Sequence, residues 1–170
     1  SKIKGRAIRV RQAEENEEIT TLDEVKRTLD PEMMVIADAE RALVVAGVMG
    51  SVDAEVDDTT VDIVLESAWF QPGNVRATSR KLGLHSDSSQ RFSRNVDPEG
   101  LSYAGERAAS LILELAGGEL IPECVSVGSS PRGERSIEIQ KSFVEKTCGF
   151  EVDEQELSKS WERLGFSVSG

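Results

Sequence analysis

Two short apolar runs, separated by a turn-sized polar segment, constrain the fold of this chain more than any other feature. Residues 33–37 and 42–46 are almost entirely apolar, and Asp-Ala-Glu-Arg at 38–41 separates them. Runs of this length and composition predict two buried strands that are joined by a tight turn. Gly47 and Gly50 follow directly. Two glycines at this point indicate a turn with positive φ or a close approach of the backbone.

Weaker patterns predict further elements. Residues 7–11 alternate apolar and charged side chains, and we expect additional strands at 19–22, at 61–66 and at 136–139. A helix is expected after Pro72 with Gly83 at its end, and another after Asp97 and Pro98 that runs to Gly117. Two further helices are expected, one with a capping box that begins at Ser142 and one at 153–164.

These elements predict an α+β chain with mixed β-sheets and helices, followed by part of a small helix-containing module. Residues 128–133 have the composition of a linker, so we place the first domain at 1–127 and the second at 134–170. An apolar start at 166–168 has no partner strand in the chain, and we expect the sequence to be a segment of a longer protein.

Composition excludes several classes of protein. The 170 residues carry a formal net charge of −11, which argues against a protein whose main task is to coat DNA or RNA. Two cysteines and one histidine are too few for a structural zinc site, and we expect no metal and no disulfide. No apolar run has the length of a membrane span. The default expectation is a cytoplasmic protein with no membrane partner.

The most unusual stretch is polar and contains the only histidine. His85, Ser86 and Asp87 resemble the members of a hydrolytic triad, but neighbours in a chain point in different directions, and no G-x-S-x-G elbow is present. We therefore assign no catalytic side chain. The residues alone favour His85 as a loop residue or a helix-cap partner.

Basic residues cluster in the same part of the sequence. Between residues 76 and 94 five basic side chains accompany one acidic side chain. Arg76 and Arg80 would share one helical face, and Arg91 and Arg94 follow. Contact with phosphate and ordinary salt bridging explain this cluster equally well.

Glu66 ends one of the expected strands, before Ala-Trp-Phe at 68–70. A carboxylate near aromatic residues can bind a polar ligand group inside an apolar pocket. The pattern alone nevertheless favours a strand-end side chain that faces solvent.

Four stretches together resemble the bacterial phenylalanyl-tRNA synthetase β-subunit family. They are Val-Ile-Ala-Asp at 35–38, Ala-Gly-Val-Met-Gly at 46–50, Leu-Glu-Ser-Ala-Trp-Phe at 65–70, and Arg-Lys-Leu-Gly-Leu-His-Ser-Asp-Ser-Ser-Gln-Arg-Phe-Ser-Arg-Asn-Val-Asp-Pro at 80–98. The resemblance implies that residues 1–127 are the later part of a B3/4 editing module and that residues 134–170 begin a B5 module.

The resemblance also implies a function. B3/4 modules of the family hydrolyse tyrosine wrongly attached to tRNA(Phe), with a positioned water and the terminal ribose of the tRNA instead of a protein nucleophile. The implied partners are the synthetase α subunit and tRNA(Phe). ATP and magnesium act elsewhere in the parent enzyme, so no cofactor is expected here. The alternative is a non-catalytic structural or tRNA-positioning module.

The resemblance assigns roles to individual positions. Glu66 corresponds to the glutamate that binds the tyrosine hydroxyl, Gly47 and Gly50 to pocket glycines, and Ser86 and Ser88 to positions beside the substrate. His85 lies in the same loop without a proton-transfer role, and Arg76, Arg80, Arg91 and Arg94 are candidates for tRNA contact. Relatives often have glycine where this chain has Asn95, which tolerates the same left-handed backbone. The earlier part of the module is expected to supply an asparagine and a histidine, so we expect the segment alone to be inactive.

Overall fold

A computed structural model describes residues 2–122, 124–128 and 136–169 of the chain. It contains two compact units, Ser1–Pro131 and Arg132–Gly170, which are described separately. Most of the expected linker at 128–133 lies outside the described residues. None of the described helices has the length and apolar character that a membrane crossing requires.

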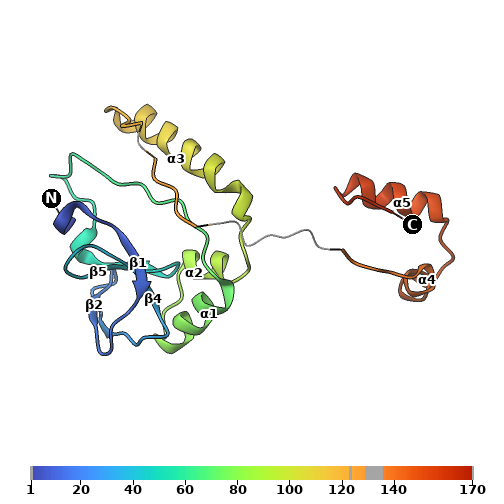
Figure 1. The fold of residues 1–170 in the computed structure, drawn as a ribbon, viewed down its shortest axis with the longest axis horizontal. Coiled ribbons are helices and arrows are strands. Elements are labelled where there is room, and N and C mark those ends of the chain that lie inside the picture. Colours follow the sequence, from blue (N-terminus) through green and yellow to red (C-terminus); the bar gives the residue numbers. More distant parts are fainter. Residues whose placement is uncertain (1, 123, 129–135, 170) are drawn as a thin grey trace. The chain divides into compact units, whose positions relative to one another are not determined.

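The first unit contains two small antiparallel sheets, which lie beside α1 and α2 in Figure 1. One has the strand order β1-β4-β5-β6, and the other pairs β2 with β3. The strands are β1 (Arg9–Gln12), β2 (Glu18–Thr20), β3 (Lys26–Thr28), β4 (Met34–Ala37), β5 (Ala42–Val45) and β6 (Met49–Gly50). A bridge between Thr21 and Ser51 joins the two sheets. The α+β class is confirmed, although every described strand pair is antiparallel and the sheets are therefore not mixed.

The expected hairpin of two buried strands is confirmed as β4 and β5. Asp38, which begins the turn between them, is only 3% exposed. Its carboxylate accepts hydrogen bonds from the backbone N–H groups of Lys4 at 2.8 Å, Glu40 at 2.8 Å and Arg41 at 3.0 Å. Burial acts to raise the pKa of Asp38, but these three donors outweigh it and hold the pKa below its ordinary value.

Three helices follow the sheets in the first unit. They are α1 (Pro72–Lys81), α2 (Asp87–Phe92) and α3 (Leu101–Ala116), with short 3₁₀ turns at Lys4–Arg6, Val52–Ala54 and Pro98–Gly100. Helix α1 begins at the expected proline and ends before Gly83, which has a φ of +61°. Helix α3 begins about one turn later than expected: Asp97 caps the 3₁₀ turn by accepting from the N–H of Glu99, and the α-helix begins at Leu101.

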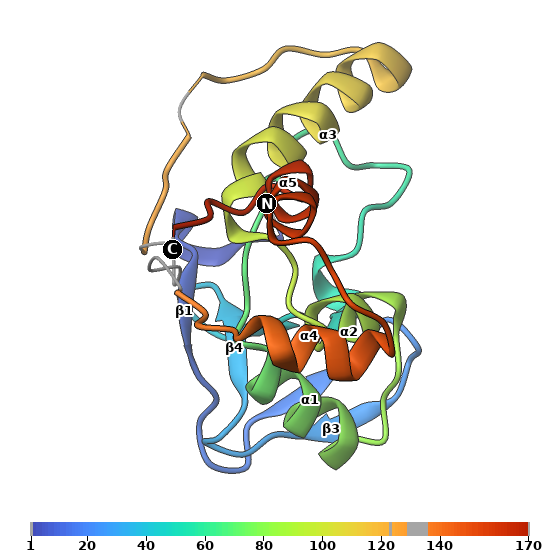
Figure 2. The same ribbon diagram turned by 90° about the vertical axis from the view of Figure 1, so that its right-hand side faces the viewer.

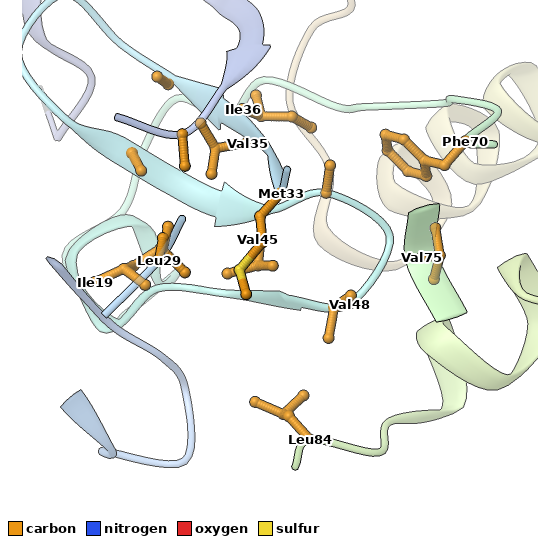
Figure 3. Packing of buried hydrophobic residues seen from close by; sticks show 14 residues of the cluster. Ile19, Leu29, Met33, Val35, Ile36, Val45, Val48, Phe70, Val75 and Leu84 are labelled. Carbon is orange, nitrogen blue, oxygen red and sulfur yellow. The ribbon is translucent and has the colours of Figure 1, made fainter. Parts of the chain in front are cut away.

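The core joins the sheets to the two shorter helices (Figure 3). Val35 and Val45 are fully buried between neighbouring strands, and Val75 of α1 is 1% exposed. Phe70 contacts Phe92 of α2 edge to face, with ring centroids 4.9 Å apart. This packing fixes α1 and α2 against the end of the β4–β5–β6 sheet. Helix α3 contains no buried residue and extends away from that sheet in both views (Figures 1 and 2).

Several predicted strands are wrong or displaced. The expected strand at 7–11 is β1, shifted to Arg9–Gln12, and the one at 19–22 is β2. The expected strand at 61–66 is absent, and the apolar side chains there are exposed, Val61 by 91% and Val64 by 69%. Its composition favours a strand, but a strand also needs a neighbour, and none pairs with this segment among the described residues.

The second unit contains α4 (Lys141–Cys148) and α5 (Glu154–Arg163). The helix expected at 153–164 is confirmed as α5, and Asp153 caps it by accepting from the N–H groups of Gln155 and Glu156. The expected capping box at Ser142 is wrong, since α4 begins one residue earlier, after Gln140, with no side-chain cap. The residues at 136–139 and at 166–168 form no strand. None of the described residues in this unit is buried.

Candidate functional site

The serine side chains in α1, in α2 and next to α2 donate hydrogen bonds to backbone carbonyl oxygens. The pairs are Ser79 with Leu84 (2.7 Å), Ser86 with Val48 (2.5 Å), Ser88 with Gly47 (3.2 Å), Ser89 with Ser86 (2.9 Å) and Ser93 with Gln90 (3.2 Å). A hydroxyl has a single hydrogen to donate, so these side chains organise the backbone. That no serine acts as a nucleophile stays a prediction.

Ser86 connects three parts of the site. It is the N-cap of α2: its hydroxyl oxygen accepts from the N–H of Ser89 at 3.0 Å, and its own N–H donates to the hydroxyl oxygen of Ser89 at 2.9 Å. Its hydroxyl also reaches the carbonyl oxygen of Val48, in the turn between β5 and β6. Helix α2, which sequence reasoning did not predict, therefore begins against the glycine-containing turn.

An apolar cavity of about 360 Å³ lies between this turn, α2 and residue 66. Its apolar lining comes from Leu22, Val44, Val48, Met49, Phe70 and Phe92. The other lining residues are Gly47, Gly50, Glu66, Ser86, Asp87 and Ser88. A cavity of this size with few polar groups is typical of a site for a small molecule or a small part of a larger one.

Of the two acids that line this cavity, Asp87 and Glu66, Glu66 is the one expected to bind a substrate. Its carboxylate makes no hydrogen bond or ion pair with any residue that the structure describes. The side chain keeps contact with solvent, while the neighbouring protein removes part of its hydration and raises the pKa of the carboxyl above its ordinary value. The expectation from pattern alone, a solvent-facing residue at a strand end, was half right: Glu66 is accessible, but it faces the cavity and follows no strand.

The two cavity glycines have different structural roles. Gly47 has a φ of +69°, and a Cβ atom there would lie 2.9 Å from atoms of both Phe70 and Val75. Gly50 has an ordinary φ, and its Cβ would meet only Leu22, at 3.5 Å. Gly47 is therefore required by the fold, whereas Gly50 leaves room at the cavity wall.

A second, polar cavity of about 350 Å³ lies between α1 and α2. Arg76 and Arg80 line it from one face of α1, as their spacing predicted. Arg76 donates to the carbonyl oxygen of Ser93 at 2.7 Å. Arg80 has no hydrogen bond or ion pair among the described residues. Arg91 and Arg94 are exposed and do not line either cavity.

His85 lines the polar cavity and not the apolar one. Its Nδ1 lies 3.3 Å from the hydroxyl oxygen of Ser79, which donates its hydrogen to Leu84 at the shorter distance of 2.7 Å. Because Ser79 has no second hydrogen to donate, its oxygen is the acceptor in the contact with His85, and Nδ1 is the donor. His85 precedes the α2 cap without being part of it.

The structure thus brings Glu66, Gly47, Gly50, Ser86 and Ser88 together around one cavity, and places His85 in its neighbour. Sequence reasoning missed the apolar lining and the residues Ser79, Asp87 and Gln90. The helical spacing of Arg76, Ser79 and Arg80 was the available signal for the polar cavity. No group of three or more metal-binding side chains occurs within residues 2–122, 124–128 and 136–169.

Asn95 adopts the left-handed backbone that was expected of it, with a φ of +70°. Its side-chain oxygen accepts a hydrogen bond from Nε1 of Trp69 at 3.1 Å. The asparagine thus keeps the turn and also fixes the indole ring, which a glycine cannot do.

Comparison with known proteins identifies similar chains. Phenylalanine–tRNA ligase β subunits match 99% of this chain in Carboxydothermus hydrogenoformans, with 44% identity, and in Moorella thermoacetica, with 45% identity. The β subunit of Halalkalibacterium halodurans is 38% identical over 94% of the chain. The chain spans about a fifth of the length of these relatives. The sequence model of the B3/4 domain matches residues 1–117, and the chain therefore belongs to the B3/4 domain family.

Proposed function

We propose that this chain is part of the proofreading site of a phenylalanine–tRNA ligase β subunit, and that the site removes tyrosine wrongly attached to tRNA(Phe). The observation that carries this proposal is the position of Glu66, an unpartnered carboxylate on a cavity whose walls are otherwise mostly apolar. The names of the relatives and the family match support the same assignment.

The chemistry of the cavity fits a para-hydroxyl group. The apolar walls accept an aromatic ring, and the carboxylate accepts a hydrogen bond from the phenol at its end. Phenylalanine would bury the same carboxylate without a partner, which costs the hydration of a charged group. A site of this kind selects the substrate that carries the hydroxyl.

Hydrolysis in this proposal uses water and no covalent intermediate with the chain. The oxygen of water bonds to the ester carbonyl carbon, the bond to the ribose oxygen breaks, and that oxygen takes a proton. The serines near the cavity donate to backbone carbonyls and hold its wall in place. Their role is to fix the geometry in which the ester and a water meet.

The surrounding assembly belongs to the same proposal. Residues 1–127 would be the later part of the B3/4 module, 128–133 a linker and 134–170 the start of a B5 module. The α subunit and tRNA(Phe) would be the partners, in the cytoplasm, with ATP and magnesium used in other parts of the enzyme. We expect the segment alone to be inactive and the complete β subunit to edit.

The test is deacylation of Tyr-tRNA(Phe) by the assembled ligase whose β subunit contains this chain. Glu66→Ala is expected to slow the removal of tyrosine by about 10- to 100-fold, the value of a lost hydrogen bond to a charged group. Attachment of phenylalanine serves as the control and should not change.

A second outcome would favour the other class of function. If Glu66→Ala leaves tyrosine removal intact while Arg80→Ala weakens tRNA binding, the module positions RNA and does not edit. Arg80 is chosen for this test because its guanidinium is exposed and can contact RNA phosphate.

A further inference from the structure

Two arginines, Arg76 and Arg80, line the polar cavity between α1 and α2, and their guanidinium groups have N–H donors available for a ligand. The hydroxyl groups of all four serines that line it donate to backbone carbonyls. Arg80 has no partner among the described residues, and Arg76 uses only one nitrogen, on the carbonyl oxygen of Ser93. A guanidinium group presents several N–H donors in one plane, which matches the oxygens of a phosphate.

The charge of this cavity differs from that of the chain. Two arginines and one acid, Asp87, line it, whereas the chain as a whole carries −11. Lys81, next to Arg80, is already paired with Asp30 and lies 3.7 Å from Glu32. Lys81 is therefore neutralised by acidic neighbours, whereas Arg80 remains available to a ligand. The cavity is a local positive site.

The polar and apolar cavities share two wall residues, Ser86 and Asp87. A ligand that extends past this shared wall would place different groups in the two cavities. In an aminoacyl-tRNA the ester is on the terminal ribose, and the 5′ phosphate of that nucleotide is the nearest anion. We propose that the polar cavity binds this phosphate, with Arg80 as the principal contact and Arg76 as the second, while the amino acid occupies the apolar cavity. This inference rests on the proposed function for the identity of the nucleotide.

Direct binding of small probes to the full 170-residue chain tests the proposal. The probes are adenosine 5′-monophosphate (the terminal nucleotide of tRNA), adenosine and inorganic phosphate, each titrated by calorimetry or NMR. We expect adenosine 5′-monophosphate to bind at least about 10-fold more tightly than either of the other two, because it combines a phosphate that pairs with a guanidinium and the contact area of the attached nucleoside.

Three variants separate this cavity from general surface charge. Arg80→Gln should weaken binding of the monophosphate about 10-fold, and Asp87→Asn should strengthen it about 3-fold because the opposing charge is removed. Arg107→Gln makes the same charge change as Arg80→Gln at an exposed position of α3 and should change the affinity by less than about 2-fold. Unchanged adenosine affinity in each variant shows that the fold is intact.

The outcomes distinguish this inference from the proposed function. Equal affinities for the monophosphate and adenosine, or for the monophosphate and inorganic phosphate, would overturn the nucleotide-phosphate site. An Arg80→Gln effect no larger than that of Arg107→Gln would also overturn it. Glu66→Gln should leave binding of the monophosphate unchanged, so a failed tyrosine-editing test together with Arg80-dependent binding would reject the editing proposal alone.

Discussion

The hydroxyl of Ser88 donates a hydrogen bond to the carbonyl oxygen of Gly47, 3.2 Å away, and so joins α2 to the turn between β5 and β6. Ser86 makes the equivalent bond to Val48. The wall of the apolar cavity is therefore held by two serine side chains that bond to neighbouring carbonyl groups. This arrangement gives the two serines of the loop a structural role at the cavity wall.

The two serines should contribute unequally to stability. Ser86→Ala removes both the helix cap and the bond to Val48, and should lower the free energy of unfolding by about 2–3 kcal/mol. Ser88→Ala removes one bond and should cost about 1 kcal/mol. Urea denaturation measures both, with Ser102→Ala on the exposed side of α3 as the matched control. Equal losses at positions 86 and 88 would contradict the capping role.

The two glycines of the turn provide a second comparison. Gly47→Ala should lower the free energy of unfolding by about 2–4 kcal/mol, because it strains a positive φ and forces Cβ against Phe70 and Val75. Gly50→Ala should lower the free energy of unfolding by less than about 1 kcal/mol, since the added Cβ would make only an ordinary van der Waals contact with Leu22. Thermal and urea denaturation of the two variants test this order. A Gly50→Ala variant as unstable as Gly47→Ala would show that the turn tolerates no side chain at either position.

The elements that carry a complete local signal could be predicted from the sequence. The β4–β5 hairpin, α1 with its proline and Gly83, and the Asp153 cap of α5 each combine pattern with a start or stop residue. The segment at 61–66 has strand composition without a pairing neighbour, and pairing is a property of the whole fold. Helix α2 is short and uses serine at both ends of its capping box, so the usual glutamate signal is missing.

The candidate site was predictable in its residues more than in its geometry. Family resemblance indicated Glu66 and the two glycines, while the pattern alone favoured a solvent-facing Glu66. No local pattern shows that Leu22 and Phe92, which are far apart in the sequence, line the same cavity. The sequence also treated all four arginines alike, as candidates for tRNA contact. In the structure, Arg76 and Arg80 line the polar cavity, whereas Arg91 and Arg94 line neither cavity.

Glu66 should make the fold less stable at neutral pH than a neutral side chain does. Its pKa is raised by desolvation, so the folded state holds the proton more tightly than the unfolded state. Stability is therefore highest below the ordinary pKa of 4.5 and falls as the pH rises through the folded value. Glu66→Gln should raise the melting temperature at neutral pH, with the difference vanishing in acid. Glu114→Gln, at an exposed position of α3, is the control; a neutral-pH gain for it equal to that of Glu66→Gln would contradict this account.

Asp38 should behave in the opposite way. Its lowered pKa means that the stability it contributes is present above the ordinary value of 3.8 and is lost as the pH falls through the folded value. Asp38→Ala leaves three backbone N–H groups without their acceptor and should lower the free energy of unfolding by about 2–4 kcal/mol near neutral pH. Asp38→Asn retains one acceptor oxygen and should lose less. Denaturation curves at several pH values decide the matter, and a loss below about 0.5 kcal/mol for Asp38→Ala would show that the carboxylate does not hold the turn.

In the proposed function, the carboxylate of Glu66 selects substrates by their hydroxyl group. The most direct measurement is the ratio of hydrolysis rates for Tyr-tRNA(Phe) and Phe-tRNA(Phe), in the assembled ligase, for the natural sequence and for Glu66→Gln. Glutamine keeps the size of the side chain and removes its charge. The account predicts that the preference for the tyrosyl ester falls about 10-fold or more, while attachment of phenylalanine is unchanged. A preference that survives the substitution would contradict the assignment of Glu66.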